Sequence, residues 1–232
     1  MTLIIGGMLK QSLIDYPGRL SAVVFLSGCN MACPYCHNPD LATGSRVSRT
    51  GTAELLTFLK ARTGFLDGVV LSGGEPTLQH GLADFCGQVH RLGYAIKLDT
   101  NGTRPGYLSR LISEKLIDYV AMDLKTLPER YGELARPPVA PDALHRSIDL
   151  IMTSGLEYEF RTTCTRPFVD VDTVCAIAGR IHGARLYALQ RFRADAVLDP
   201  AFFTSGDSGF DDAGMRGLQS AAAPMVKRCI VR

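Results

Sequence analysis

The sequence predicts an α/β fold, a partial (β/α)6 barrel of the TIM type with a parallel sheet. Apolar runs of strand length alternate with segments of helical periodicity between residues 20 and 192. Such alternation is typical of parallel strands joined by right-handed helical crossovers. Several of the strands also carry polar side chains on one face. This favours a barrel with a wet interior over an open sheet that helices cover on both faces.

Strands and helices are expected in strict alternation. The strands are short apolar runs bounded by turn residues, at residues 20–26, 68–71, 94–99, 118–124, 157–164 and 185–192. The helices have apolar residues three or four positions apart, at residues 52–62, 80–92, 105–115, 141–154 and 171–182. Pro105 suits the first turn of its helix, and Gly155 suits the cap after another.

Two stretches interrupt this alternation. Residues 127–141 form a proline-rich loop, long enough to indicate a function such as docking a partner. Residues 195–217 are rich in glycine and aspartate, and residues 226–232 suit one more edge strand. We expect a single domain over residues 1–232, with its core at about 18–192 and a C-terminal extension at 193–232 that packs on the core.

Composition excludes several classes of protein. With 46% hydrophobic residues, the chain can bury a core and is not expected to be disordered. The formal net charge of +2 is too small to indicate binding to nucleic acid or to a membrane surface. No run approaches the roughly 18 apolar residues that span a bilayer, and no signal peptide is expected. The seven cysteines, an odd number with one tight cluster, indicate the reducing cytoplasm.

Polar residues share faces on three of the predicted strands. Residues 157–163 alternate polar and apolar side chains. Lys97 and Asp99 point to one face of their strand, and Asp123 and Lys125 point to one face of theirs, because successive side chains of a strand alternate. This pattern indicates a cavity that receives a substrate. The alternative is that some of these residues lie in solvent at the ends of strands.

Three cysteines lie in one short loop after the first predicted strand. Cys29, Cys33 and Cys36 have the spacing Cys-x3-Cys-x2-Cys. Four thiolates complete the coordination of a [4Fe-4S] cluster, so three leave one iron without a protein ligand. An open position is typical of catalytic rather than structural metal sites. The alternative is a zinc site that includes His37, although the remaining cysteines form no second paired motif.

Further candidate residues follow the second, third and fourth predicted strands. Gly73 and Gly74 let backbone carbonyls approach a ligand, and with Glu75 they offer acceptors for an ammonium group, although the segment also suits an ordinary turn. Asp99 and Asp123 end strands that should be neighbours. We therefore hypothesise that Asp99, Thr100 and Asp123 hold a monovalent cation, with Lys125 offsetting part of the negative charge or lying in solvent.

Taken in order, these motifs resemble the radical S-adenosylmethionine (radical SAM) superfamily. The closer resemblance is to activating enzymes of glycyl-radical proteins, nearest to those of anaerobic ribonucleoside-triphosphate reductase. It spans residues 10–192, and the whole set is far more specific than any one motif. The segments that carry it are Cys29–Cys36, Ser72-Gly73-Gly74-Glu75-Pro76, Asp15-Tyr16-Pro17-Gly18, Cys36-His37-Asn38-Pro39, Asp99-Thr100-Asn101-Gly102 and Met122-Asp123-Leu124-Lys125.

The resemblance implies a [4Fe-4S] cluster whose fourth iron is chelated by S-adenosylmethionine. It implies that a 5′-deoxyadenosyl radical then abstracts a hydrogen atom from a glycine of a partner glycyl-radical enzyme. A reduced flavodoxin or a ferredoxin-type protein is the implied electron donor. The implied metal ligands are Cys29, Cys33 and Cys36, and the implied cofactor-binding residues are Tyr35, Asn38, Gly73, Gly74, Glu75, Asp99, Thr100, Asn101, Asp123 and Lys125.

Alternatives stay open at this stage. Tyr35 suits packing of the loop as well as contact with adenine, and Asn38 suits a local turn. A second enzyme class with the same cysteine loop acts on a small molecule, as the 7-carboxy-7-deazaguanine synthases do. A third class is a non-catalytic iron–sulfur or zinc module. We expect Arg161, Gln190 or Arg191 to point inward, and the other four cysteines to behave as small buried hydrophobic residues.

Overall fold

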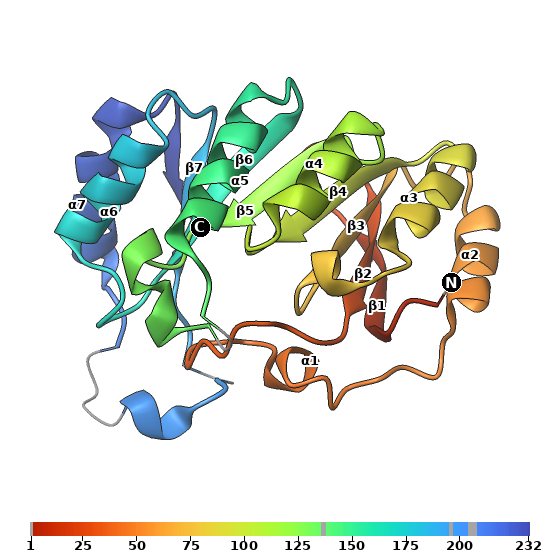
Figure 1. The fold of residues 1–232 in the computed structure, drawn as a ribbon, viewed down its shortest axis with the longest axis horizontal. Coiled ribbons are helices and arrows are strands. Elements are labelled where there is room, and N and C mark those ends of the chain that lie inside the picture. The colour runs from red at the N-terminus through yellow and green to blue at the C-terminus, as the bar shows by residue number, and fades with distance from the viewer. Residues whose placement is uncertain (1, 136–137, 195–196, 204–207) are drawn as a thin grey trace. The chain divides into compact units, whose positions relative to one another are not determined.

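The computed structural model describes residues 2–135, 138–194, 197–203 and 208–232. Within these ranges one sheet has eight strands in sequential order (Figure 1). The strands are β1 (Ile5–Ser12), β2 (Ser21–Leu26), β3 (Gly68–Gly73), β4 (Ala95–Thr100), β5 (Tyr119–Asp123), β6 (Glu157–Cys164), β7 (Tyr187–Arg191) and β8 (Cys229–Val231). This arrangement confirms the predicted α/β fold class.

Helices connect the strands from β2 onward. The α-helices are α1 (Pro39–Ala42), α2 (Thr52–Lys60), α3 (Leu82–Arg91), α4 (Pro105–Ser113), α5 (Pro141–Thr153), α6 (Val171–Arg180) and α7 (Asp212–Ala222). Short 3-10 helices are η1 (Pro76–Leu78), η2 (Pro128–Glu133), η3 (Pro200–Phe203) and η4 (Ala223–Met225). Gly155 follows α5 with a φ of +79°, which confirms the predicted cap.

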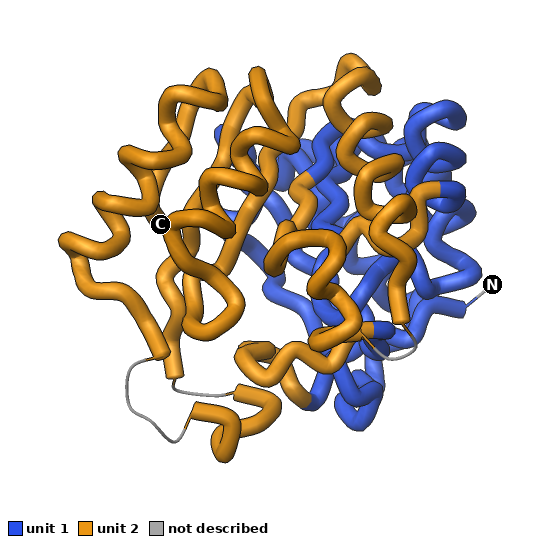
Figure 2. The backbone as a smooth tube through the Cα atoms, turned by 60° about the vertical axis from the view of Figure 1, so that its left-hand side comes forward, with its two compact units in different colours: residues 1–30, 40–100, 106–120 blue, residues 31–39, 101–105, 121–232 orange. Residues whose placement is uncertain are grey.

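The chain divides into two compact units, which Figure 2 colours separately. Unit 1 comprises Met1–Asn30, Asp40–Thr100 and Gly106–Val120, and unit 2 comprises Met31–Pro39, Asn101–Pro105 and Ala121–Arg232. The boundary falls within β5 and within the cysteine loop, so each unit holds part of both. The predicted division into a core at about 18–192 and an extension at 193–232 stays a prediction.

Unit 1 is built on β1 to β4. Strand β1 pairs antiparallel with β2, whereas β2, β3 and β4 pair in parallel. Val24 lies opposite Leu71, which lies opposite Leu98, and all three side chains are fully buried. Helix α3 packs against β4 and buries Phe85 and Val89. This apolar core fixes the register of β3 and β4, and with it the residues at their carboxyl ends.

Unit 2 is built on the end of β5 and on β6, β7 and β8. The last three strands pair in parallel, with Tyr187 opposite both Phe160 and Cys229. The Leu124 N–H donates to the Arg161 carbonyl at 2.8 Å and so ties the end of β5 to β6. Helices α6 and α7 pack side by side (Figure 1). The sheet core thereby holds the end of β5 in place.

Strand β1 and helix α7 are among the elements that were not expected from the sequence. Strand β1 carries Gly6 and Gly7 at its centre and polar residues at its end, so it shows little strand periodicity. Helix α7 begins within the glycine-rich stretch 195–217 and extends beyond it, and it forms because Met215 and Leu218 bury one face. Residues 195–196 and 204–207 of that stretch lie outside the described residues. The edge strand predicted at 226–232 is confirmed as β8.

The proline-rich stretch 127–141 is not a simple loop. It contains η2, whose Tyr131 is fully buried. Residues 136–137 of the stretch lie outside the described residues. Its predicted docking function stays a prediction.

Candidate active site

The sequence motifs follow the carboxyl ends of strands, as predicted. Gly73 is the last residue of β3, Thr100 is the last residue of β4, and Asp123 is the last residue of β5. In parallel α/β barrels this end of the sheet carries the active site. Unit 1 holds the motif residues of β3 together with Asp99 and Thr100 of β4, whereas unit 2 holds Asn101 and the motif residues of β5.

In unit 1 the glycine turn after β3 is bound to the start of the cysteine loop. The Glu75 N–H donates to the Gly28 carbonyl at 2.8 Å, and the Cys29 N–H donates to the Ala42 carbonyl at 3.0 Å. A Cβ on Gly74 would lie 2.1 Å from the Gly28 carbonyl oxygen, and Gly73 has a φ of +114°. Only glycine fits both positions, so the turn brings its backbone directly against the residue before Cys29.

Glu75 is fully buried in unit 1 and organises its neighbours. One carboxylate oxygen accepts hydrogen bonds from the Thr77 N–H at 3.1 Å, from the Thr77 hydroxyl at 2.5 Å and from the Thr100 hydroxyl at 2.8 Å. Glu75 therefore caps η1 and orients Thr100 at the end of β4. Its predicted contact with the ammonium group of a cofactor stays a prediction.

The Asp99 carboxylate is engaged by two side chains of unit 1. One oxygen lies 2.5 Å from the Lys97 ammonium nitrogen, and the other accepts a hydrogen bond from the Ser72 hydroxyl at 3.0 Å. Only 2% of the Lys97 side chain is exposed. The predicted common face of Lys97 and Asp99 is therefore confirmed, and the face is charged in the interior of the unit.

In unit 2 the second half of the cysteine loop forms a tight turn. The Cys36 N–H donates to the Cys33 carbonyl at 3.0 Å, so the two thiols belong to one short segment. Cys33 is buried and Cys36 is half-buried. Burial raises the pKa of the Cys33 thiol, and the nearby Lys125 ammonium acts in the opposite direction. A cation beside this thiol favours the thiolate that binds metal.

Tyr35 lies within the same turn and is 97% buried. Its ring packs 5.5 Å from that of Phe168, and burial raises the pKa of its hydroxyl well above the ordinary value. Among the described residues the hydroxyl has no hydrogen-bond partner. Buried hydroxyls rarely lack one, so this group is suited to contact a bound molecule.

Asp123 is paired with two cations of unit 2. The Arg161 Nε lies 2.8 Å from one carboxylate oxygen, and the Lys125 Nζ lies 3.6 Å from the other. The buried Tyr131 hydroxyl accepts a hydrogen bond from the Lys125 N–H at 2.9 Å, which fixes the chain just after β5. The predicted common face of Asp123 and Lys125 is confirmed. Sequence reasoning missed Tyr131, because nothing in the pattern of η2 distinguishes it.

Two further predicted cofactor-binding residues, Asn38 and Asn101, take no part in the contacts described above. Asn38 is exposed. Asn101 is buried, and its side chain accepts hydrogen bonds from the Thr103 N–H at 3.0 Å and from the Thr103 hydroxyl at 2.7 Å. It therefore forms a local turn after β4. The cofactor-binding roles of both residues stay predictions.

The three cysteines of the loop are divided between the units. Cys29 belongs to unit 1, whereas Cys33 and Cys36 belong to unit 2. In the ranges that the structure describes, no three His, Cys, Asp or Glu side chains form a ready-made metal site. The three-cysteine ligand set stays a prediction.

The cysteines outside the loop behave mostly as expected. Cys86 and Cys164 are fully buried, and burial raises the pKa of each thiol to about 12. Cys175 and Cys229 are half-buried.

Arg191, the last residue of β7, forms an ion pair with Asp212, with 2.8 Å between the guanidinium nitrogen and the carboxylate oxygen.

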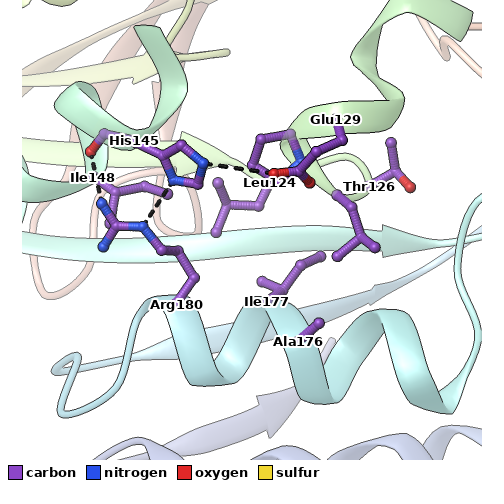
Figure 3. A pocket seen from close by; sticks show the side chains of 10 residues that line it. Leu124, Thr126, Glu129, His145, Ile148, Ala176, Ile177 and Arg180 are labelled. Carbon is purple, nitrogen blue, oxygen red and sulfur yellow. Dashed lines mark hydrogen bonds and ion pairs between the residues drawn. The ribbon is translucent and has the colours of Figure 1, made fainter. Parts of the chain in front are cut away.

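A cavity of about 250 Å³ lies in unit 2 beside η2, α5 and α6 (Figure 3). Its wall is mostly apolar and includes Leu124, Ile148 and Ile177. On one side the Arg180 Nε donates to the His145 Nδ1 at 2.8 Å, and the His145 Nε2 faces Glu129 at 3.8 Å. The residues that the sequence assigns to metal or cofactor do not line this cavity.

Comparison with known proteins identifies the family. The sequence model of the radical SAM superfamily matches residues 23–173. The chain belongs to the radical SAM superfamily. The matched region begins in β2 and includes the cysteine loop and the strand-end motifs of β3, β4 and β5. The resemblance stated from the sequence is thereby confirmed, and the family implies a [4Fe-4S] cluster and S-adenosylmethionine.

Relatives narrow the kind of radical SAM enzyme. A protein of Methanocaldococcus jannaschii, provisionally named a glycyl-radical enzyme activating enzyme, is 36% identical over 207 residues, which cover 87% of this chain and 85% of the relative. The pyruvate formate-lyase-activating enzyme of Clostridium pasteurianum is 35% identical over 121 residues, half of each chain. This radical SAM protein is therefore an enzyme of the activating kind.

Solved structures share the fold. SuiB of Streptococcus suis superposes with a TM-score of 0.64 at 15% identity, over 89% of this chain and 47% of SuiB. QueE of Escherichia coli superposes with a TM-score of 0.59 at 18% identity, over 100% of this chain and 94% of QueE. The radical SAM chain thus spans about half the length of SuiB. Among the described residues, no helix combines the length and apolar character needed to cross a bilayer.

The residues of this radical SAM chain fit the cofactors that the family implies. Thiolates are the usual ligands of iron–sulfur clusters, and the loop offers Cys29, Cys33 and Cys36. In unit 1 the glycine turn exposes no side chain toward Gly28. In unit 2 the Tyr35 hydroxyl is a buried polar group suited to a ligand.

Proposed function

We propose that the protein activates a glycyl-radical enzyme by removing a hydrogen atom from a glycine Cα of that partner. The similarity to a glycyl-radical enzyme activating enzyme over 87% of the chain carries this proposal. The motifs at the carboxyl ends of β3, β4 and β5 support it, because they lie within the matched region. The proposed partner is an anaerobic ribonucleoside-triphosphate reductase, as the sequence motifs suggest.

The chain's own residues would bind and orient the cofactors. Cys29, Cys33 and Cys36 are the proposed ligands of the cluster. When bound, the cluster and S-adenosylmethionine supply one-electron chemistry that no side chain provides. Tyr35 offers an aromatic face to the adenine. The other proposed cofactor contacts are Asn38, Gly73, Gly74, Glu75, Asp99, Thr100, Asn101, Asp123 and Lys125.

The charges of unit 2 suit the proposed role of Lys125. Its ammonium lies 3.6 Å from Asp123, whose other oxygen contacts Arg161 at 2.8 Å. Two cations therefore face one carboxylate. The Lys125 ammonium favours the Cys33 thiolate, and it is suited to attract a carboxylate group of a bound cofactor.

The test is anaerobic reconstitution with iron and sulfide, followed by incubation with candidate partners, S-adenosylmethionine and a reductant. Electron paramagnetic resonance should then show a glycine-centred doublet on the partner. The same substitution at two cysteines provides the matched control. Cys36→Ala should abolish the doublet and lower the bound iron, whereas Cys175→Ala, outside the loop, should retain both.

Two outcomes would redirect the proposal. Release of 5′-deoxyadenosine without a doublet on any partner would favour an enzyme acting on a small molecule, such as a 7-carboxy-7-deazaguanine synthase. Absence of both products from a fully loaded protein would favour a non-catalytic iron–sulfur module. A reduced flavodoxin or ferredoxin-type donor is the proposed electron source, tested by replacing the chemical reductant with each protein.

Two finer predictions remain. A cytoplasmic location rests on cysteine usage alone, and cell fractionation tests it.

A monovalent cation at Asp99, Thr100 and Asp123 is tested by measuring cofactor affinity with and without sodium or potassium. The contacts of Asp99 in unit 1 favour a different source of positive charge, the ammonium group of Lys97.

A further inference from the structure

Lys97 is a fully buried lysine in the middle of β4. Lysine is almost never fully buried unless its charge is paired, because removing an ammonium group from water is costly. Only 2% of this side chain is exposed, and its nitrogen lies 2.5 Å from an Asp99 oxygen. Among the described residues, Asp99 is the one carboxylate that pairs with it. The buried ammonium of Lys97 therefore pairs with the Asp99 carboxylate.

Asp99 lies closer to the surface of unit 1 than its lysine partner. Its side chain is 13% exposed, compared with 2% for Lys97. The ammonium contacts one oxygen from within the unit, and the Ser72 hydroxyl donates to the other oxygen at 3.0 Å. A direct contact of this length leaves no room for a metal ion between the two groups. The position beside that oxygen is already filled by a positive charge.

Aromatic residues hold the ammonium group in place. Its nitrogen lies 5.8 Å from the centre of the Tyr119 ring, a distance at which a cation is attracted to the ring face. The Tyr119 ring in turn packs edge-on against Tyr16, with centroids 5.8 Å apart. Tyr16 belongs to the Asp15-Tyr16-Pro17-Gly18 motif, whose function the cluster and cofactor do not explain. Tyr16 therefore packs against the ring that contacts the Lys97 ammonium group.

We infer that the Lys97 ammonium is a built-in cation for Asp99 and makes a bound monovalent metal ion unnecessary there. A lysine ammonium is a compact point charge with the same charge as a sodium or potassium ion. Because the ammonium belongs to a side chain of β4, it neutralises the Asp99 carboxylate whichever salt is in solution. Lys97 is thus a positioning residue, since it acts by holding the Asp99 carboxylate in place.

The first test uses the cluster-free protein and is independent of the proposed function. Thermal unfolding is followed in chloride salts of sodium, potassium and choline at equal ionic strength, so that general screening is constant. The unfolding temperature of the wild type should agree within about 2 °C among the three salts. Specific stabilisation by sodium or potassium in the wild type, beyond that margin, would overturn the inference.

The second test removes the ammonium group. Lys97→Met should lower the unfolding temperature in choline chloride, and sodium or potassium should restore part of the loss. The matched control, Lys10→Met, changes an exposed lysine of β1 and should show neither effect. Equal loss in all three salts would contradict the inference. If Lys97→Met does not fold, the salt comparison on the wild type still decides the question.

A third test extends the inference to the cofactor and rests on the proposed function. Calorimetry on the reconstituted wild type should give the same dissociation constant for S-adenosylmethionine in all three salts, within about twofold. A tenfold or greater dependence on sodium or potassium would show that a metal ion is required. Failure to bind S-adenosylmethionine in any salt would count against the proposed function and leave the result on the cluster-free protein intact.

Discussion

Asp99 and Asp123 occupy equivalent places in the two units, yet their positive partners differ in depth. Each aspartate lies at or next to the end of its strand, and each has a lysine two residues away on the same face. Lys97 precedes Asp99, and its side chain is 2% exposed, with its nitrogen 2.5 Å from an Asp99 oxygen. Lys125 follows Asp123, and its side chain is 19% exposed, with its nitrogen 3.6 Å from an Asp123 oxygen. The order of charges along the strand decides which cation is interior.

The reason is the direction of the strand. Residues two apart share a face, so the lysine before the aspartate lies deeper in the sheet, and the lysine after it lies beyond the carboxyl end. A deep cation such as Lys97 acts mainly on its partner, because its other contact among the described residues is with the Tyr119 ring. A cation beyond the strand end can also act on neighbouring groups, and Lys125 does so on Cys33. Lys97 therefore neutralises its partner inside unit 1, whereas Lys125 also acts on a neighbouring thiol.

The largest expected effect is on the buried pair. Lys97→Met should lower the free energy of unfolding by about 3 kcal/mol, because it removes the buried ammonium group that contacts the partly buried Asp99 carboxylate. Urea denaturation followed by circular dichroism measures this loss. The double variant Lys97→Met with Asp99→Asn removes both charges, and it should recover most of the loss. A double variant no more stable than Lys97→Met would show that burial of the methionine, rather than the lost pairing, causes the effect.

These charge pairs show how far the sequence leads. Alternation along the strand predicts that Lys97 and Asp99 share a face and that Asp123 and Lys125 do, and both predictions are confirmed. The fold class follows from the same periodicity, since the apolar runs of β2 to β7 form a core. The family follows from the spacing of Cys29, Cys33 and Cys36 together with the strand-end motifs.

The rest depends on contacts between residues distant in sequence. Periodicity does not reveal that Arg161 on β6 reaches Asp123 on β5, nor that Tyr131 secures the following chain. The glycines of β1 and α7 lower the local propensity of both elements, and tertiary packing overrides it. Depth within a sheet is likewise a property of the assembled strands, so the sequence could not rank Lys97 against Lys125.

A third aspartate sharpens the comparison, because hydrogen bonds rather than an ammonium group satisfy it. Asp170 caps α6, and hydrogen bonds from the Thr173 hydroxyl and N–H hold the pKa of its carboxyl below the ordinary value. Asp170→Ala should lower the free energy of unfolding by about 1 kcal/mol at pH 7. The folded-state pKa is depressed, so this contribution is present above about pH 4 and is lost as the pH falls through the folded-state value.

Urea denaturation at a series of pH values checks this prediction. The difference between the wild type and Asp170→Ala should shrink as the pH falls below about 4, because the carboxyl of the unfolded chain takes up a proton there before that of the folded protein does. Asp170→Asn keeps an amide oxygen that accepts the Thr173 N–H, so it should cost less than alanine and show no such pH dependence. A constant difference between wild type and alanine across the whole range would contradict the capping role.

The smallest expected effect on unfolding is at the second lysine. Lys125→Met, the substitution used at Lys97, should change the free energy of unfolding by only about 0.5 kcal/mol, because Arg161 stays on Asp123 and both side chains of the Lys125–Asp123 pair are partly exposed. Urea denaturation of Lys97→Met and Lys125→Met under one condition gives the ratio of their losses in free energy of unfolding. Equal losses would mean that depth does not separate the two lysines, and the assignment of binding to Lys125 would lose its physical basis. A large ratio would leave Lys125 available to contact a bound molecule, since the fold does not depend on it.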